Sequence, residues 1–322
     1  MKIRSLIGML PLLAASFLQG QAPTQRGLVL AQDNLSFPAP LMGSLRWTAN
    51  RLAGCDYCNG ARATLWAMDR QGNREAVAFE IPGAGYTRVR DVASGPDGSL
   101  TAVGFAISGD SRQGTFIAWI SPDTTRQVIT RVWPYDPQVV TVAADATIWT
   151  LGSMFNDRDY VQYPNVLRHY TSSGQLLAST IVHGVRKNNG GTYKVGNTST
   201  LMASNDRIGW LTAACQYIEF SFEAVPLGSY SCPNGYTSNR QVSGAALSAT
   251  DDLLVEGKGP APLAPLQLDR GTNTWNPAPV YQDTGETRRL LGFDGTTLVT
   301  WSAASYSMRR YVWADQPAAG GQ

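Results

Sequence analysis

The stretch that decides the fold is RVRDVASGPDGSLTAVGFAISGDSRQGTFIAWISPDTTRQVITRVWP, residues Arg88 to Pro134. It contains four short runs with alternating apolar residues: Val89–Ala93, Leu100–Ala106, Phe116–Ile120 and Val128–Trp133. Turns rich in Gly, Pro and Asp, or a polar loop, separate these runs. Alternation with a period of two is typical of strands that bury one face, and these turn residues allow the chain to reverse. The stretch therefore predicts a four-stranded antiparallel meander.

The same meander recurs along the chain. The register mark is the first apolar residue after the turn between the first two strands of each unit. These marks are Leu52, Leu100, Ile148, Ile208, Leu253 and Leu298. They lie 45 to 60 residues apart, close to the ~40–50 residues of one propeller blade, and the longest interval contains the Gly- and Asn-rich segment Val182–Thr200. We therefore predict an all-β chain that forms a six-bladed β-propeller of four-stranded antiparallel blades.

The sixth unit lacks a fourth strand. After its third strand, at Arg310–Asp315, only the small and polar tail Gln316–Gln322 remains. The apolar run Gly27–Leu30 precedes the first unit and belongs to none. Because an open ring would expose strand edges, we predict that this N-terminal strand closes the ring by completing the sixth blade. The alternative is a loose N-terminal arm.

Two segments, Val92–Leu100 and Val142–Trp149, resemble the repeats of bacterial secreted six-bladed β-propellers, loosely the NHL-repeat and TolB-like proteins. The resemblance implies a propeller fold and an exported location, and it implies no activity. The related sugar-lactone hydrolases hold a metal through well-spaced Glu, Asn and Asp residues, and their motifs have no match in this sequence.

The N-terminus predicts a secretory signal peptide over residues 1–22. Basic residues in Met1–Arg4 precede the apolar segment Leu6–Leu18, and small residues follow at Gly20–Ala22. The alternative is an uncleaved membrane anchor. We expect the propeller over residues 23–315, a flexible tail over 316–322, and a secreted or periplasmic location without membrane insertion after signal removal.

Composition excludes some partners. Without Lys2 and Arg4 the chain has 24 basic and 24 acidic residues, and it contains no long basic run. A balanced charge argues against general binding to nucleic acid. Low charge with 32 Gly and 18 Pro fits a β-rich chain with many turns.

The four cysteines predict disulfides, as expected in an exported protein. Cys215 and Cys232 lie at the two ends of a predicted hairpin, so we expect them to bridge. Cys55 and Cys58 form a C-x-x-C pair, for which we expect a small disulfide-closed loop. A thiol–disulfide exchange site is the alternative for this pair. A zinc site would need a second close cysteine pair beside Cys55 and Cys58, and the sequence has none.

One face of a propeller is built from the loops between strands two and three and from the connections between blades. Tyrosine and arginine are concentrated there, and both supply the contact area and hydrogen bonds that recognition needs. The candidate ligand-binding residues are Tyr57, Tyr86, Arg88, Arg112, Tyr135, Asp157, Arg158, Asp159, Tyr160, Tyr193, Tyr236 and Tyr281. The alternative is that these tyrosines only cover strand ends. Asp157 and Asp159 are the candidate calcium ligands, and a self-paired loop is the simpler interpretation.

Signals for catalysis are weak. The chain has two histidines, too few for a three-histidine metal centre, and no Gly-x-Ser-x-Gly or phosphate-binding motif. His169 is expected to pack in a strand. Paired carboxylates for glycoside hydrolysis have candidates in Asp91, Asp136, Asp157, Asp159 and Asp283, without evidence that any two face each other.

The sequence therefore favours an exported, non-catalytic module, without cofactor or resident metal, that binds a protein, peptide or glycan on its loop face. The alternative is a carbohydrate-active or lactone-type hydrolase with carboxylates at the channel mouth. Whether the chain is an enzyme stays open, and a channel filled by apolar side chains would favour binding.

Overall fold

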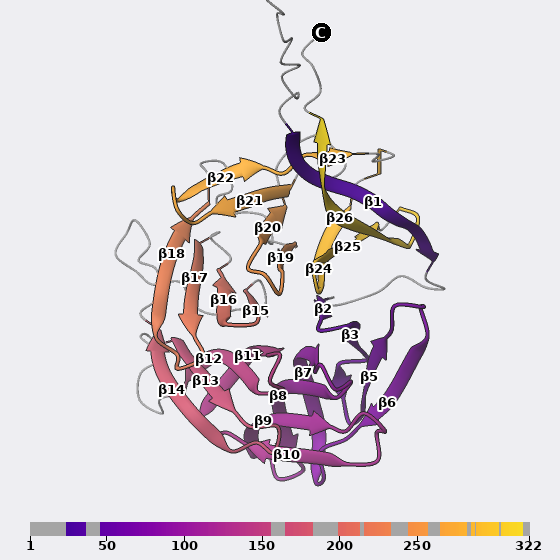
Figure 1. Ribbon diagram of the computed structural model, residues 1–322. Helices are drawn as coiled ribbons and strands as arrows, with labels where there is room; N and C mark the ends of the chain where they lie inside the picture. The colour runs from indigo at the N-terminus through magenta and orange to yellow at the C-terminus, as the bar shows by residue number, and fades with distance from the viewer. Residues whose placement is uncertain are drawn as a thin grey trace, which may run out of the picture.

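The computed structural model describes residues 24–36, 46–155, 165–182, 199–212, 216–232, 244–256, 265–281, 285–286, 288–302 and 304–317. The predicted signal peptide lies outside this part of the chain. Within it the regular elements are all strands, arranged as radial sheets around a ring (Figure 1). No helix long and apolar enough to cross a membrane occurs in the described residues.

The first three blades are meanders, each with neighbouring strands in chain order. Blade 1 consists of β2 (Arg46–Thr48), β3 (Arg51–Asp56), β5 (Ala63–Met68) and β6 (Arg74–Phe79). Blade 2 consists of β7 (Ala84–Ser94), β8 (Leu100–Ser108), β9 (Gln113–Ile120) and β10 (Gln127–Arg131). Blade 3 consists of β11 (Tyr135–Val142), β12 (Ile148–Met154), β13 (Asn165–Tyr170) and β14 (Leu176–Val182). The short β4 (Asn59–Gly60) leaves the blade 1 loop and joins the edge of β7, which the sequence did not predict.

The other three blades repeat this order. Blade 4 consists of β15 (Thr200–Ala203), β16 (Arg207–Leu211), β17 (Gln216–Ser221) and β18 (Pro226–Ser231). Blade 5 consists of β19 (Ala245–Leu247), β20 (Leu253–Glu256), β21 (Pro265–Asp269) and β22 (Thr274–Pro277). Blade 6 consists of β24 (Arg289–Asp294), β25 (Thr297–Ser302), β26 (Ser307–Pro317) and β1 (Thr24–Ser36), and the short β23 (Val280–Tyr281) joins the same sheet as a fifth strand at its edge. The six register marks all lie in second strands, so the prediction of six four-stranded blades is confirmed.

The ring is closed as predicted, by the N-terminal strand. β1 runs antiparallel to β26, with Leu28 opposite Trp313 and Val29 opposite Val312 (Figure 1). β26 continues to Pro317, two residues beyond the expected end of the propeller. On its other side β1 pairs in parallel with β23. The first and the last described strands, β1 and β26, therefore belong to one sheet, which closes the ring.

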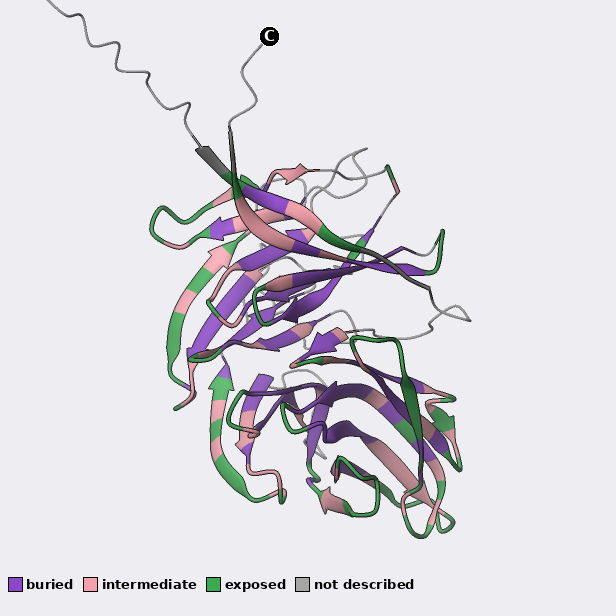
Figure 2. Cartoon of the chain, turned by 45° about the vertical axis from the view of Figure 1, so that its right-hand side comes forward, coloured by how far each residue is buried: buried purple, intermediate pink, exposed green. Residues whose placement is uncertain are grey.

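The core consists of separate layers, one between each pair of neighbouring blades. In Figure 2 the buried residues follow the inner strands, and exposed residues gather on outer strands and turns. The layer between blades 1 and 2 contains Leu65, Phe79 and Phe116. The layer between blades 6 and 1 contains Trp47, Trp66 and Trp301. Indole rings bury a large area each, which suits a joint between two sheets with few residues.

Candidate functional site

The middle of the central channel is lined mainly by apolar residues and is narrow. A cavity of about 50 Å³ there is lined by residues from the first strands of five blades, among them Trp47, Leu247 and Phe293. A second cavity of about 140 Å³ opens at the turns between first and second strands and is lined mainly by small residues such as Ala49 and Ala249. No group of three or more His, Cys, Asp or Glu residues in the described part of the chain could hold a metal ion.

Arg46 crosses the channel on the loop-face side of this apolar layer. Its guanidinium forms an ion pair with Asp91 of blade 2. It also donates hydrogen bonds to the carbonyl oxygens of Val140 in blade 3, at 3.2 Å, and of Leu201 in blade 4, at 2.6 Å. The Val140 amide donates to the same Asp91 oxygen at 2.8 Å. One side chain of blade 1 thus ties three other blades together and occupies the axis of the ring.

Asp91 and Asp136, two of the acids considered for paired-carboxylate chemistry, are both engaged by arginine. Asp91 pairs with Arg46, and Asp136 pairs with Arg90 and accepts a hydrogen bond from Gln138 at 2.6 Å. Burial raises the pKa of Asp136, and the Arg90 guanidinium opposes this shift. The other candidates for paired-carboxylate chemistry, Asp157, Asp159 and Asp283, lie outside the described residues. Asp91 and Asp136 therefore act as contacts between neighbouring blades in this structure.

A groove of about 400 Å³ lies on the loop face where blade 1 meets blade 2. The connection between the blades supplies Ile81 and Pro82, and the sheet of blade 2 supplies Phe116 and Ile129. Ile81 and Ile129 pack against the same core layer that contains Phe116, so the groove is the open outer end of the joint between the two blades. Its floor is apolar and rests on a packed core.

Charge at the groove is uneven. Arg112 and Asp110 at one rim pair with each other at 3.0 Å, and both are exposed. A hydrogen bond from the Ser108 hydroxyl lowers the pKa of Asp110, which keeps it ionised. Arg131 lies at the end of β10. Its Nε is 3.4 Å from the position that a Cβ would take if Gly114 carried a side chain. No carboxylate among the described residues pairs with Arg131. The groove therefore combines an apolar floor with one uncompensated positive charge.

The predicted ligand-binding residues are scattered rather than gathered. Arg112 borders the groove. Tyr57 is 85% exposed on the neighbouring blade 1 loop. Tyr86 packs against Phe105, with ring centroids 6.2 Å apart. Successive residues of a strand point to opposite faces of the sheet. Thr87 shares a face with its partner Ala106, which lines the groove. Tyr86 and Arg88, on either side of Thr87, therefore lie on the opposite face of the blade 2 sheet.

The prediction for Tyr135 was wrong. Its side chain is fully buried, and its hydroxyl forms hydrogen bonds with Thr150 and with the Val166 carbonyl oxygen. Tyr281 lies in β23. Its ring is only 2.2 Å from the position that a Cβ on Gly27 would take, so the Tyr281 side chain packs against the closing strand β1. The remaining candidates lie outside the described residues: Asp157, Arg158, Asp159, Tyr160, Tyr193 and Tyr236.

The cysteines also differ from expectation. Cys55 and Cys58 are free thiols, which corrects the predicted bridge between them. The C-x-x-C spacing allows a bridge but does not set the distance between the two sulfur atoms. Cys232 is in a disulfide bond. Its predicted partner, Cys215, lies outside the described residues, so that pairing stays a prediction.

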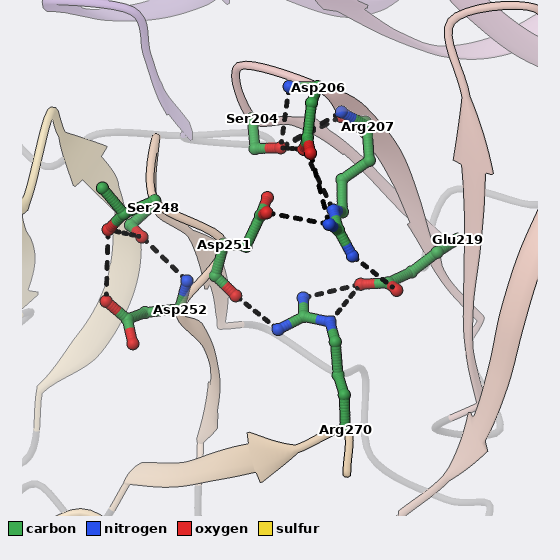
Figure 3. Close-up of polar contacts among 9 residues, drawn as sticks. Ser204, Asp206, Arg207, Glu219, Ser248, Asp251, Asp252 and Arg270 are labelled. Atoms are coloured by element: carbon green, nitrogen blue, oxygen red, sulfur yellow. Dashed lines mark hydrogen bonds and ion pairs between the residues drawn. The ribbon is translucent and has the colours of Figure 1, made fainter.

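The densest group of buried charges joins blades 4 and 5 (Figure 3). The Glu219 carboxylate is 1% exposed and accepts hydrogen bonds from Arg207 at 3.2 Å and from Arg270 at 2.8 Å. Arg207 also pairs with Asp251 at 2.9 Å. The turn that carries Asp251 joins the first two strands of blade 5, so this network lies on the face opposite the groove. Each guanidinium in it is compensated, and the network acts as a contact between blades.

Sequence reasoning missed the residues that form the groove. Ile81, Pro82, Ile129 and Arg131 come from a blade connection and an outer strand, which were not part of the tyrosine-rich set. The groove lies between the connection from blade 1 and the sheet of blade 2, and such a relation between distant segments leaves no local sequence signal. The available hint was the apolar pair Ile81-Pro82 in a connection expected to be polar.

No family model and no curated protein matches this chain. Among solved structures, it is similar to a putative exported protein from Bacteroides fragilis, with 13% identity over 91% of this chain and 95% of that one and a TM-score of 0.47. The propeller domain of the Trilobed protease from Pyrococcus furiosus has 9% identity over 92% of this chain and 99% of that one, with a TM-score of 0.44. A protein of unknown function from Bacteroides caccae has 12% identity over 80% of this chain and 85% of that one, with a TM-score of 0.45. At these identities the likeness concerns the fold and says nothing about function.

Proposed function

We propose that this chain is an exported, non-catalytic binding module that holds a peptide or protein segment in the groove between blades 1 and 2. The observation that carries the proposal is the pairing of an apolar floor, Ile81, Phe116 and Ile129, with the uncompensated Arg131. An apolar anchor residue would displace water from the floor, and a carboxylate beside it would pair with the guanidinium.

The state of the channel supports binding over catalysis. Its middle is narrow and lined mainly by apolar residues, and Arg46 occupies the axis above them. A substrate entering from the loop face would have to displace an arginine held by three blades. The groove, in contrast, is open and needs no rearrangement to accept an extended segment, which lowers the cost of binding.

The test is an array of synthetic octapeptides, each with one aliphatic or aromatic residue and one Asp or Glu at a spacing of one to four residues. Binding is measured by fluorescence polarisation with the purified mature protein. We expect a subset to bind, and Arg131→Gln to weaken these peptides by about tenfold, the value of one charge-assisted hydrogen bond. Ile129→Asp should abolish binding, because it places a charge on the apolar floor.

A matched control is Arg126→Gln, which removes the same charge from the exposed turn before β10. It should leave peptide affinity unchanged. Binding that is equally weakened by Arg126→Gln and Arg131→Gln would reduce the effect to general electrostatics and refute the groove. A glycan array run in parallel tests the other ligand class. Glycan binding lost in Ile129→Asp, with no peptide bound, would overturn the assignment to a peptide.

A further inference from the structure

The C-x-x-C pair lies at the end of β3, beside the joint between blades 1 and 2. Cys55 is buried in the core layer between these blades, whereas Cys58 is half-buried at its margin. The Cys58 thiol donates a hydrogen bond to the Cys55 carbonyl oxygen, with the sulfur 3.0 Å from that oxygen. The tight turn is made by Tyr57, which has a φ of 51° and points into solvent. The two thiols are thus held together with different access to water.

The two cysteines also differ in acidity. A hydrogen bond with the Cys55 thiol lowers the pKa of Cys58, and the same hydrogen bond, with burial, raises the pKa of Cys55. Asp56 lies between them in sequence, and its negative charge opposes the lowering of the Cys58 pKa. Its carboxylate accepts a hydrogen bond from the Trp66 indole at 3.1 Å and pairs with Arg74. Thiolate character and access together determine cysteine reactivity.

The backbone around the pair is fixed. The Val89 amide donates to the Cys58 carbonyl oxygen at 2.8 Å, and the next two residues, Asn59 and Gly60, pair with β7. On the other side, Cys55 pairs with Leu65 in β5. The only unpaired backbone between the cysteines is the turn itself. The two cysteines therefore lie on either side of a short turn that is anchored to both blades.

We propose that Cys55 and Cys58 form a dithiol that exchanges with small-molecule or peptide disulfides, with Cys58 as the attacking residue and Cys55 as the resolving one. The Cys58 thiolate attacks one sulfur of the incoming disulfide, forms a mixed disulfide and releases the first thiolate, which takes up a proton. Cys55 then loses its proton and attacks the Cys58 sulfur, which releases the second thiol. The dithiol is oxidised by two electrons to a Cys55–Cys58 disulfide, and the incoming disulfide is reduced to two thiols.

This proposal is independent of the peptide groove, because it needs neither Arg131 nor the apolar floor. It also differs from a structural disulfide, because a structural bridge resists reduction by glutathione, whereas an exchanging pair responds to the redox poise.

The experiment uses the purified mature protein in buffers of reduced and oxidised glutathione, with alkylation and peptide mass spectrometry to read each cysteine separately. In the wild type we expect the Cys55–Cys58 disulfide to form and to disappear reversibly as the buffer changes. In Cys55→Ser, Cys58 should accumulate a glutathione mixed disulfide. In Cys58→Ser, the buried Cys55 should react more slowly by about tenfold or more, because it is less accessible and less ionised.

The same peptide map follows Cys232 and serves as an internal reference, and circular dichroism confirms that each variant is folded. The proposal is overturned if the pair stays oxidised in fully reduced glutathione, since that is a structural bridge. It is also overturned if Cys55 and Cys58 react at equal rates, or if Cys55→Ser fails to trap glutathione while folded.

Discussion

Arg46 and Asp91 form an ion pair across the axis of the propeller, between the first strands of blades 1 and 2. The side chains of both residues are almost inaccessible to water, at 12% and 3% exposure. Arg46 satisfies two further carbonyl oxygens in blades 3 and 4. A propeller whose blades contact only their neighbours gains from such a link, because it connects blades that do not touch each other directly.

This link gives a prediction about stability. Arg46→Met keeps an unbranched apolar stem but leaves Asp91 buried without a cation, so we expect a loss of about 3–5 kcal/mol in the free energy of unfolding. Asp91→Asn should also destabilise the protein, because the arginine loses its counter-charge. The double variant should lose about 2 kcal/mol less than the two single variants together, since the two residues interact. Urea unfolding of all four proteins measures this coupling, and additive losses would contradict it.

The closing strand gives a second prediction. Leu28 of β1 is fully buried in the layer between blades 5 and 6. Leu28→Ala should reduce the free energy of unfolding by about 2–5 kcal/mol, because it removes buried methyl groups and leaves a cavity. Gln32→Ala, at an exposed position of the same strand, is the matched control and should have little effect. Thermal and urea unfolding make the comparison. Equal stability of both variants would mean that β1 contributes nothing to the closed ring.

The network of blades 4 and 5 gives a third prediction. Glu219→Gln removes the buried charge that compensates both Arg207 and Arg270. We expect a loss on the order of 3 kcal/mol, at the lower end of the range for a broken buried pair, because both guanidinium groups retain some contact with water. Glu223→Gln, in the exposed turn of the same blade, should be nearly neutral. A similar small effect for both substitutions in urea unfolding would contradict the role assigned to Glu219.

The features that the sequence predicted are those with local causes. The turn Gly95–Gly98 has its own hydrogen bonds, from Gly98 to the Gly95 carbonyl oxygen and from Gly95 to that of Ser99, so its residues alone specify the reversal. Counting such turns gave six blades, and the missing strand of blade 6 then pointed to Leu28 and its neighbours. The closing strand could be predicted because an unpaired edge has to be covered by some segment of the chain.

The candidate site was predicted less well, for two physical reasons. Tyr135 is the first residue of β11, and a shift of one residue at a strand end moves a side chain from solvent to core. The sequence cannot fix the strand end that closely. The groove depends on how far Ile81 lies from Ile129, and Ile81 belongs to the connection between blades whereas Ile129 belongs to the outer strand of blade 2. Such distances follow from the packing of two sheets, which no short stretch of residues encodes.

His169 gives the last prediction, on the dependence of stability on pH. Its ring stacks on Trp149 with centroids 4.0 Å apart, and its Nε2 is buried without a hydrogen-bond partner among the described residues. Burial lowers the pKa of His169 below its ordinary value. The unfolded chain therefore binds a proton more readily than the native one, so the free energy of unfolding should fall as the pH drops below about 6.5. His169→Phe retains the stacking but has no proton to gain, so its stability should decline less over the same range. Urea unfolding at pH 7.5, 6.5 and 5.5 gives the slope of stability against pH for both proteins.

Two carboxylates also contribute to these slopes. Burial raises the pKa values of Asp136 and Asp251, so they act in the opposite direction to His169, and they do so equally in both proteins. The difference between the slopes therefore isolates His169, and identical slopes would show that its imidazole gains a proton as easily in the folded protein as in the unfolded one.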